Sequence, residues 1–241
     1  MKITVINGTE QKGCTFSMKE LFLSAMGEGH CVTEFFLPRD CPVFCTGCKA
    51  CFFSDIRSCP HSRYTVPVWE SILSADLLVF TSPAYVFHVT AQMKALLDHY
   101  GTKWIAHSPE KPLFSKQAVI ITNAIGQGMG KAAAAIKDSL DYWGVARTYI
   151  VKQALFQAKW ENVSPGRKKA INDQCKIIAK KIVRKKKVVP CLKVRLIFHL
   201  MKIAQKMIDK AELKAGREHS KDYLYWKENG WIDGKKPWKN E

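Results

Sequence analysis

Four cysteines are spaced so that their sulfur atoms can surround one metal centre. Cys45, Cys48 and Cys51 follow one another at intervals of three residues, and Cys59 comes eight residues later. Thiolates three residues apart can curl around a single centre, and a more distant fourth thiolate completes the set. Tetrahedral zinc fits the same four sulfurs. A third alternative is a group of free thiols that bind no metal.

A loop between Asn7 and Thr15 combines glycines with hydroxyl side chains. The segment reads Asn-Gly-Thr-Glu-Gln-Lys-Gly-Cys-Thr and follows an apolar run. A bound phosphate needs several N–H donors aimed at one point, with a helix N-terminus behind them. Gly8 and Gly13 allow the tight path, and Thr9 adds a hydroxyl. The alternative is an ordinary strand-to-helix loop in which Thr15 caps the helix.

Two further loops have residues suited to a flat ring. One contains Ser82, Pro83, Ala84 and Tyr85, and the other is the glycine-rich segment 122–130. Both directly follow apolar runs, and ligands of open α/β sheets bind beyond the carboxyl ends of strands. The alternatives are a tyrosine that packs on its neighbours and a flexible turn before a helix.

Alternating strands and helices must position these loops. Short apolar runs predict strands at 2–7, 34–37, 77–81, 118–122 and 148–151. Helices are predicted at about 15–26, 89–99 and 131–143. This alternation predicts an α/β fold with a doubly wound, five-stranded parallel sheet. In the flavodoxin-like strand order, the first and third strands flank the ligand crevice, so their loops are expected to converge.

The composition changes near Gly166. Residues 1–165 have 16 Lys and Arg against 13 Asp and Glu, whereas residues 166–241 have 22 against 8, a net charge of +14. We therefore divide the chain into an α/β domain, 1–165, and a basic helical C-terminal extension, 166–241. Apolar residues recur with helix period from Leu192 to Leu213, which favours packing on the protein's own core or on a second subunit. An anionic membrane surface is a less favoured partner, and nucleic acid is disfavoured because no reader motif accompanies the charge.

The sequence also lacks several signals. No apolar run has the length of a membrane span, and Met1–Gly8 lacks the basic start and long apolar stretch of a signal peptide, so we expect a cytoplasmic protein. No Ser–His–Asp order, HExxH motif or Walker loop is present. His99 is expected at a helix end, where a protonated imidazole suits the helix dipole.

Three segments together resemble the NADPH-dependent FMN reductase family. They are the first loop with its GT and KGCT residues, the stretch SADLLVFTSPAYVFHVTAQMKALLDHYG and the stretch AVIITNAIGQG. The likeness covers roughly residues 1–160, and within the family it is similar to the iron–sulfur flavoprotein branch.

The resemblance implies a non-covalently bound FMN. Its phosphate would lie at Thr9, Gly13, Cys14 and Thr15, with Lys12 in place of an arginine that is common in the family. The flavin ring would contact Ser82, Pro83, Ala84 and Tyr85 along one edge and Thr122, Ala124 and Gly126 along another. The same resemblance implies a [4Fe–4S] cluster on Cys45, Cys48, Cys51 and Cys59, and a homodimer or higher homo-oligomer.

The predicted function is electron transfer from NAD(P)H through FMN to a small-molecule or protein acceptor. No catalytic side chain is expected, because the flavin itself accepts and donates hydride. A cluster would add a one-electron outlet. The alternative is a non-catalytic binding or regulatory module that uses the basic extension to contact a membrane or nucleic acid.

Overall fold

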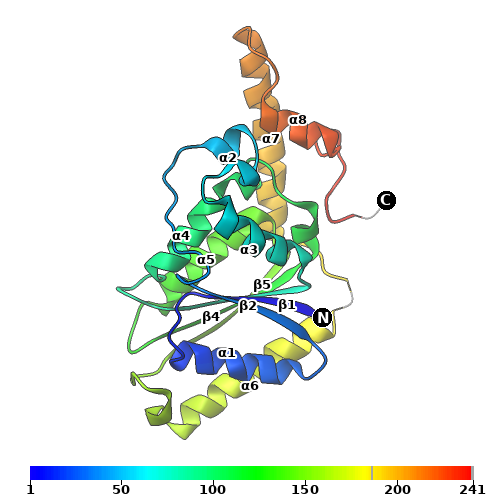
Figure 1. Cartoon of the computed structure of the whole chain (residues 1–241). Coiled ribbons are helices and arrows are strands. Elements are labelled where there is room, and N and C mark those ends of the chain that lie inside the picture. Colours follow the sequence, from blue (N-terminus) through cyan, green and yellow to red (C-terminus); the bar gives the residue numbers. More distant parts are fainter. Residues whose placement is uncertain (186, 240–241) are drawn as a thin grey trace.

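The fold is built around a five-stranded sheet whose neighbouring strands are all parallel (Figure 1). We describe residues 1–185 and 187–239 of a computed structural model. The strands are β1 (Lys2–Asn7), β2 (Cys31–Phe36), β3 (Leu77–Pro83), β4 (Gln117–Ala124) and β5 (Arg147–Ala154). Their order is β2-β1-β3-β4-β5, which is the flavodoxin-like order. The predicted fold class is confirmed.

Helices cover both faces of the sheet (Figure 1). The α-helices are α1 (Cys14–Met26), α2 (Ala50–Phe53), α3 (Ser62–Ser74), α4 (Ala91–His99), α5 (Met129–Trp143), α6 (Pro165–Val183), α7 (Leu192–Lys214) and α8 (Lys221–Glu228). Short 3₁₀ helices are η1 (Ile56–Ser58), η2 (Gly101–Lys103), η3 (Lys111–Ser115) and η4 (Trp160–Asn162). Helices α1 and α6 lie on one face, and α3, α4 and α5 lie on the other.

The central strands were the easiest to predict because both of their faces are covered. Every residue of β4 is buried, as is every residue of β3 except its last. The edge strand β2 has no fully buried residue, so its apolar signal is weak. It starts at Cys31, earlier than the predicted residue 34, because Cys31 is already paired with Lys2 of β1.

The C-terminal extension contributes to two different layers. Helix α6, which we assigned to the extension, packs beside α1 and buries Ile171, Cys175 and Ile178 against the sheet. Helices α7 and α8 instead form a third core with η3, where Phe198 and Trp226 stack at 4.8 Å and Phe114 packs against them. The domain boundary at residue 165 stays a prediction. Helix α6, which follows it, belongs to the layer of helices that covers the sheet.

None of the helices in the described residues is long and apolar enough to cross a membrane.

Candidate functional site: a crevice at the carboxyl edge of the sheet

The first loop starts at the end of β1 and is tied to the end of β3. The backbone N–H of Gly8 donates to the carbonyl oxygen of Thr81 at 2.7 Å. A Cβ atom on Gly8 would lie 2.7 Å from that oxygen, so this approach requires glycine. The hydroxyl of Thr90 donates to the carbonyl oxygen of Gly8, also at 2.7 Å. The loop is therefore held over the carboxyl ends of two neighbouring strands.

Helix α1 begins in this loop with backbone donors that have no acceptor. Gly13 is the N-cap residue, and no side chain caps the helix. Among the described residues, the N–H groups of Cys14, Thr15 and Phe16 donate to no other residue. The first turn also lacks an acidic side chain. Free N–H groups at the positive end of a helix dipole attract anions, so the loop has the donors that a phosphate needs.

The side chain of Thr15 links this helix to the end of β4. Thr15 is buried, and its hydroxyl donates to Oδ1 of Asn123. Its backbone N–H is among the free donors, whereas its hydroxyl is already used within the protein. Thr15 therefore positions the start of α1 relative to β4.

A tight turn after β3 forms an aromatic wall of the crevice. Tyr85 and His88 exchange two backbone hydrogen bonds, of 2.9 and 3.0 Å. Between them, Val86 and Phe87 have φ values of 48° and 65°, in the left-handed region that such side chains rarely adopt. A Cβ atom on Gly128 would lie 2.6 Å from Cα of Phe87, so the loop after β4 packs directly on this turn. The turn is held by its neighbours and leaves Tyr85 half exposed.

These loops enclose one hollow of about 360 Å³. That volume falls within the range of about 300–1,000 Å³ typical of small-molecule sites. The predicted cofactor residues that line it are Thr9, Gly13, Cys14, Thr15, Pro83, Ala84, Tyr85 and Ala124. The structure thus brings the loop after β1 and the aromatic wall together in one crevice.

Four predicted cofactor residues do not line the hollow. The exposed Lys12 places its ammonium group 5.5 Å from the centre of the Phe16 ring. The buried hydroxyl of Ser82 accepts from the N–H of Thr90 at 3.1 Å and thereby holds the turn. Thr122 is buried. Gly126 is partly exposed and directly follows Ile125, which does line the hollow.

Other lining residues were not predicted. They are Gln11, Asn123, Ile125, Gln157 and Ala158. Gln157 and Ala158 follow β5, and the thiol of Cys14 donates to the carbonyl oxygen of Ala158 at 3.5 Å. The position of β5 beside β4 was the available signal, because loops after parallel strands emerge at the same edge.

Cys14 stays a neutral thiol at the N-terminal end of α1. Burial, followed by the negative charge of Glu161, raises the pKa of the Cys14 thiol. A thiolate would oppose a phosphate at this position. The raised pKa therefore favours a structural role for Cys14 over redox chemistry.

The cysteine-rich segment lies outside this hollow. Cys45 and Cys48 are exposed, while Cys51 and Cys59 are partly buried. Burial raises the pKa of the Cys51 thiol, and the neighbouring Cys59, Cys45 and Cys48 raise it further. Among the described residues, however, no three of these four sulfurs lie close enough together for one ion. The four-cysteine cluster therefore stays a prediction.

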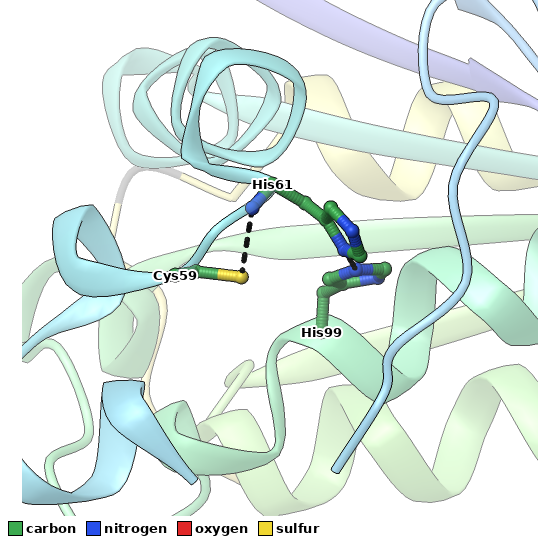
Figure 2. Close-up of side chains that lie close together, drawn as sticks. All are labelled: Cys59, His61 and His99. Atoms are coloured by element: carbon green, nitrogen blue, oxygen red, sulfur yellow. Dashed lines mark hydrogen bonds between the residues drawn. The ribbon is translucent and has the colours of Figure 1, made fainter. Parts of the chain in front are cut away.

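Cys59 instead lies beside two histidines (Figure 2). The backbone N–H of His61 donates to Sγ of Cys59 at 3.4 Å, and Nδ1 of His61 lies 3.1 Å from Nε2 of His99. Burial lowers the pKa of His99, so its ring is neutral near pH 7. His99 is at the end of α4, as predicted, but its burial there disfavours the protonated form that would suit the helix dipole.

Comparison with known proteins identifies the family to which the α/β domain belongs. Residues 1–161 match the sequence model of the family described as NADPH-dependent FMN reductase. The chain belongs to this family. This family member is therefore an oxidoreductase with a flavodoxin-like fold. No curated protein matches the chain.

Solved structures share the fold at low sequence identity. A flavone reductase has TM-score 0.56 and 14% identity, and the match covers 79% of this chain and 66% of that protein. An FMN-dependent NADH-azoreductase from Bacillus anthracis str. Ames Ancestor, in complex with FMN, has TM-score 0.55 and 13% identity, over 76% of this chain and 100% of the azoreductase. An NADH:FMN oxidoreductase in its apo form has TM-score 0.53 and 17% identity, over 77% and 91%.

Proposed function

We propose that this oxidoreductase binds FMN in the crevice, takes electrons from NAD(P)H and delivers them to a separate acceptor. The observation that carries the proposal is the uncapped N-terminus of α1, which lies in the same hollow as Tyr85. An anion and a flat ring can be bound there together. Membership of the FMN reductase family and the FMN complex of the similar azoreductase support the choice of ligand.

The residues present fit the phosphate end of FMN. The N–H groups of Cys14, Thr15 and Phe16 supply donors that the protein leaves unused. Thr9 lines the same hollow, and its hydroxyl can add a donor. The bond from Thr15 to Asn123 fixes the helix end before any ligand arrives, which reduces the ordering cost of binding.

The other end of the crevice suits an aromatic ring. Pro83, Ala84 and Tyr85 line one side, and Ala124 and Ile125 line another. These apolar groups exclude water from a bound ring. Bound FMN would supply a hydride acceptor and donor, so the protein needs only to bind and orient its substrates.

The loops that follow β3, β4 and β5, next to the crevice, expose apolar residues that a second copy of the chain could cover. Val86 is 94% exposed, and Phe87, Ile125 and Phe156 are each more than half exposed. We propose a homodimer in which these residues are buried. Sedimentation equilibrium tests this, because Val86→Lys should dissociate the dimer whereas Val183→Lys, at an exposed position on α6, should not. A dimer that persists unchanged in Val86→Lys contradicts this arrangement.

FMN titration and NAD(P)H oxidation test the proposed function directly. Purified protein should be yellow, or should become so when FMN is added, and should oxidise NADH or NADPH when a soluble quinone is the acceptor. A colourless protein that cannot be reconstituted with FMN would favour the non-catalytic alternative.

Two pairs of variants locate the site. Thr15→Asp should abolish FMN retention, because it places a carboxylate beside the phosphate, whereas Ser164→Asp keeps a good N-cap on α6 and should have no effect. Tyr85→Ala should weaken FMN binding by about 1–2 kcal/mol, whereas Phe44→Ala, at an exposed aromatic residue outside the crevice, should not. Unchanged FMN affinity in both Thr15→Asp and Tyr85→Ala would remove the crevice as the site.

A further inference from the structure

A group of possible metal ligands lies outside the crevice, at Cys59, His61 and His99 (Figure 2). The ligand atoms of these three side chains all lie within 4.8 Å of one another. Cys59 follows η1, His61 immediately precedes α3, and His99 is the last residue of α4. The short link between η1 and α3 and the end of α4 therefore bring one sulfur and two nitrogens to the same point.

The surroundings of His99 leave its converging nitrogen with a free lone pair. Nδ1 of His99 lies 2.8 Å from the carbonyl oxygen of Ala95, which can only accept a hydrogen bond. Nδ1 therefore carries the proton, and Nε2, which faces His61, does not. Donation from the second ring nitrogen to a carbonyl is how proteins commonly orient a metal-binding imidazole. His99 is also buried, which fixes the ring.

We propose that Cys59, His61 and His99 bind Zn²⁺, with water as an exchangeable fourth ligand. Zinc accepts sulfur and nitrogen ligands in tetrahedral geometry, and Zn–N bonds of about 2.0–2.1 Å place two nitrogens about 3.3 Å apart. The two facing nitrogens are 3.1 Å apart. No fourth Cys, His, Asp or Glu in the described part of the chain joins the group. Binding converts the Cys59 thiol to a thiolate and releases its proton to solvent.

The zinc site and the predicted four-cysteine cluster exclude each other, because both use Cys59. Apart from Cys59, the two sites require different ligands. The zinc site needs His61 and His99 but not Cys48, whereas the cluster needs Cys48 but not His99. Metal analysis of single variants therefore separates them.

Elemental analysis of anaerobically purified protein tests the proposal. Wild type and Cys48→Ser should each hold about one zinc per chain, and His99→Asn should hold at least about tenfold less. His88→Asn, an exposed histidine outside the group, should match wild type. Because replacing a buried histidine can unfold the protein, the partly exposed His61→Asn should also be measured, with circular dichroism as the check on folding.

Two outcomes overturn the zinc site. One is a zinc content below about a tenth of an equivalent in wild-type protein that has been titrated with Zn²⁺ after metal removal. The other is bound iron that disappears in Cys48→Ser but remains in His99→Asn. The second outcome would establish the four-cysteine cluster in its place.

A second, independent inference concerns α7, which has apolar residues on two opposite faces. One face packs on the protein through Val194, Ile197 and Phe198. The other face carries exposed apolar side chains, which are 50–82% exposed: Leu192, Leu196, Leu200, Ile203 and Met207. At 3.6 residues per turn these five fall within a stripe about 80° wide and about 22 Å long. These exposed fractions make the stripe accessible, and in Figure 1 the far end of α7 extends beyond the rest of the molecule.

Cations lie beside this stripe. Lys202, Lys206 and Lys210 belong to the same helix, and none of them pairs with an acidic group among the described residues. At the start of α7 a hollow of about 530 Å³ is lined mainly by basic and aromatic side chains: Lys187, Arg195, His199, Lys236, Trp238 and Lys239. An apolar stripe with basic neighbours is the pattern of helices that lie in a membrane interface.

We propose that the stripe on α7 lies on an anionic lipid bilayer, with lipid phosphates at the neighbouring basic hollow. The positive charge of the C-terminal extension favours an anionic bilayer over a second copy of the chain. Residues 166–241 have a net charge of +14, so two copies meeting at α7 would repel each other, whereas an anionic surface attracts them. No helix among the described residues can span the bilayer, so the contact is at its surface.

Vesicle flotation tests this proposal with the full chain. The protein should float with vesicles of phosphatidylcholine and phosphatidylserine and much less with phosphatidylcholine alone. Leu196→Glu combined with Leu200→Glu should reduce flotation at least about tenfold, since it removes two apolar anchors and adds repulsion. Ile177→Glu, at an exposed apolar residue of α6, is the matched control and should float like wild type.

Inorganic phosphate and sedimentation distinguish the bilayer from a free phosphate ion and from a second copy of the chain. If a free phosphate ion rather than a lipid is the ligand of the hollow, the protein should bind inorganic phosphate in isothermal titration but should not float with anionic vesicles, and that result contradicts the proposal. A wild-type dimer that the double Glu variant dissociates would assign the stripe to a second copy. Equal flotation of wild type and the double variant would also overturn the proposal.

Discussion

The α/β domain and α7 both expose apolar side chains, but at different kinds of place. In the domain, exposed Tyr85, Val86 and Ile125 lie on loops around the crevice, above strands that are buried throughout. On α7 the exposed leucines run along a regular helix, opposite the face that packs on the core. Loops place a few apolar groups around a small concave site, whereas a helix presents a long, straight stripe. The first arrangement suits a small planar ligand, and the second suits an extended surface.

Only one of the two regions lies within the match to the family. The family match ends at residue 161, before α6 begins. The residues that line the crevice therefore all lie within the family match, while the stripe on α7 belongs to a segment outside it. Variants that affect one region and not the other can test this division.

The largest expected effect on stability comes from the core beneath α7. Phe198 is buried, and Phe198→Ala should lower the free energy of unfolding by about 3–5 kcal/mol. Leu200 lies two residues later, on the exposed side of α7. Leu200→Ala should change the free energy of unfolding by less than about 0.5 kcal/mol. Urea denaturation measures both. Equal losses in the two variants would contradict the assignment of the buried and exposed faces.

A smaller effect is expected where two crevice loops touch. Gly128 has a φ of 100°, and a Cβ there would collide with the backbone of Phe87. Gly128→Ala should therefore destabilise the protein by about 1–3 kcal/mol and weaken FMN binding about tenfold. Gly130→Ala, where a Cβ meets no atom within 4 Å, is the control and should be neutral or slightly stabilising. If both substitutions behave alike, close loop contact does not shape the crevice.

The smallest effect concerns Thr122, whose buried hydroxyl has no hydrogen-bond partner among the described residues. Thr122→Val should stabilise the FMN-free protein by about 1 kcal/mol, because the unpaired hydroxyl is removed. Thr4→Val should instead destabilise it by about 1 kcal/mol, since Thr4 donates to the carbonyl oxygen of Ser71 at 2.9 Å. Thermal unfolding compares the two. A loss of stability in Thr122→Val would show that its hydroxyl has a partner.

The crevice could be predicted from the sequence because strand ends are encoded locally and imply which loops meet at one edge of the sheet. The apolar runs that became β1, β3 and β4 are continuous, and the residues that follow them meet at one edge. Which side chains face the hollow was harder to predict. Lys12 turns toward Phe16, and Ser82 holds Thr90, because each finds a nearby partner that the sequence does not reveal.

The group at Cys59 could not be predicted for a different reason. Its second histidine, His99, is 38 residues from His61, and their meeting depends on where α3 begins and α4 ends. Likewise, the basic composition of α6 concealed its place beside α1, because the few residues it buries are scattered among polar and basic ones. Contacts between distant elements leave no spacing pattern in the chain.

The most direct test of the phosphate site is the affinity for FMN of Gly13→Asp. Gly13 is the N-cap of α1 and has open space around it, so an aspartate can cap the free N–H groups without strain. Stability should be kept or raised. FMN affinity should fall at least about 10³-fold, because a single negative charge of the phosphate about 4 Å from the carboxylate costs about 4 kcal/mol near a protein surface.

Gly166→Asp makes the same change in the first turn of α6 and should leave FMN affinity unchanged. Isothermal titration of wild type and both variants with FMN gives the comparison. We predict a loss of affinity in Gly13→Asp alone, in a protein that is at least as stable as wild type. Wild-type affinity in Gly13→Asp would contradict the proposed site, because the phosphate would then not lie at the start of α1.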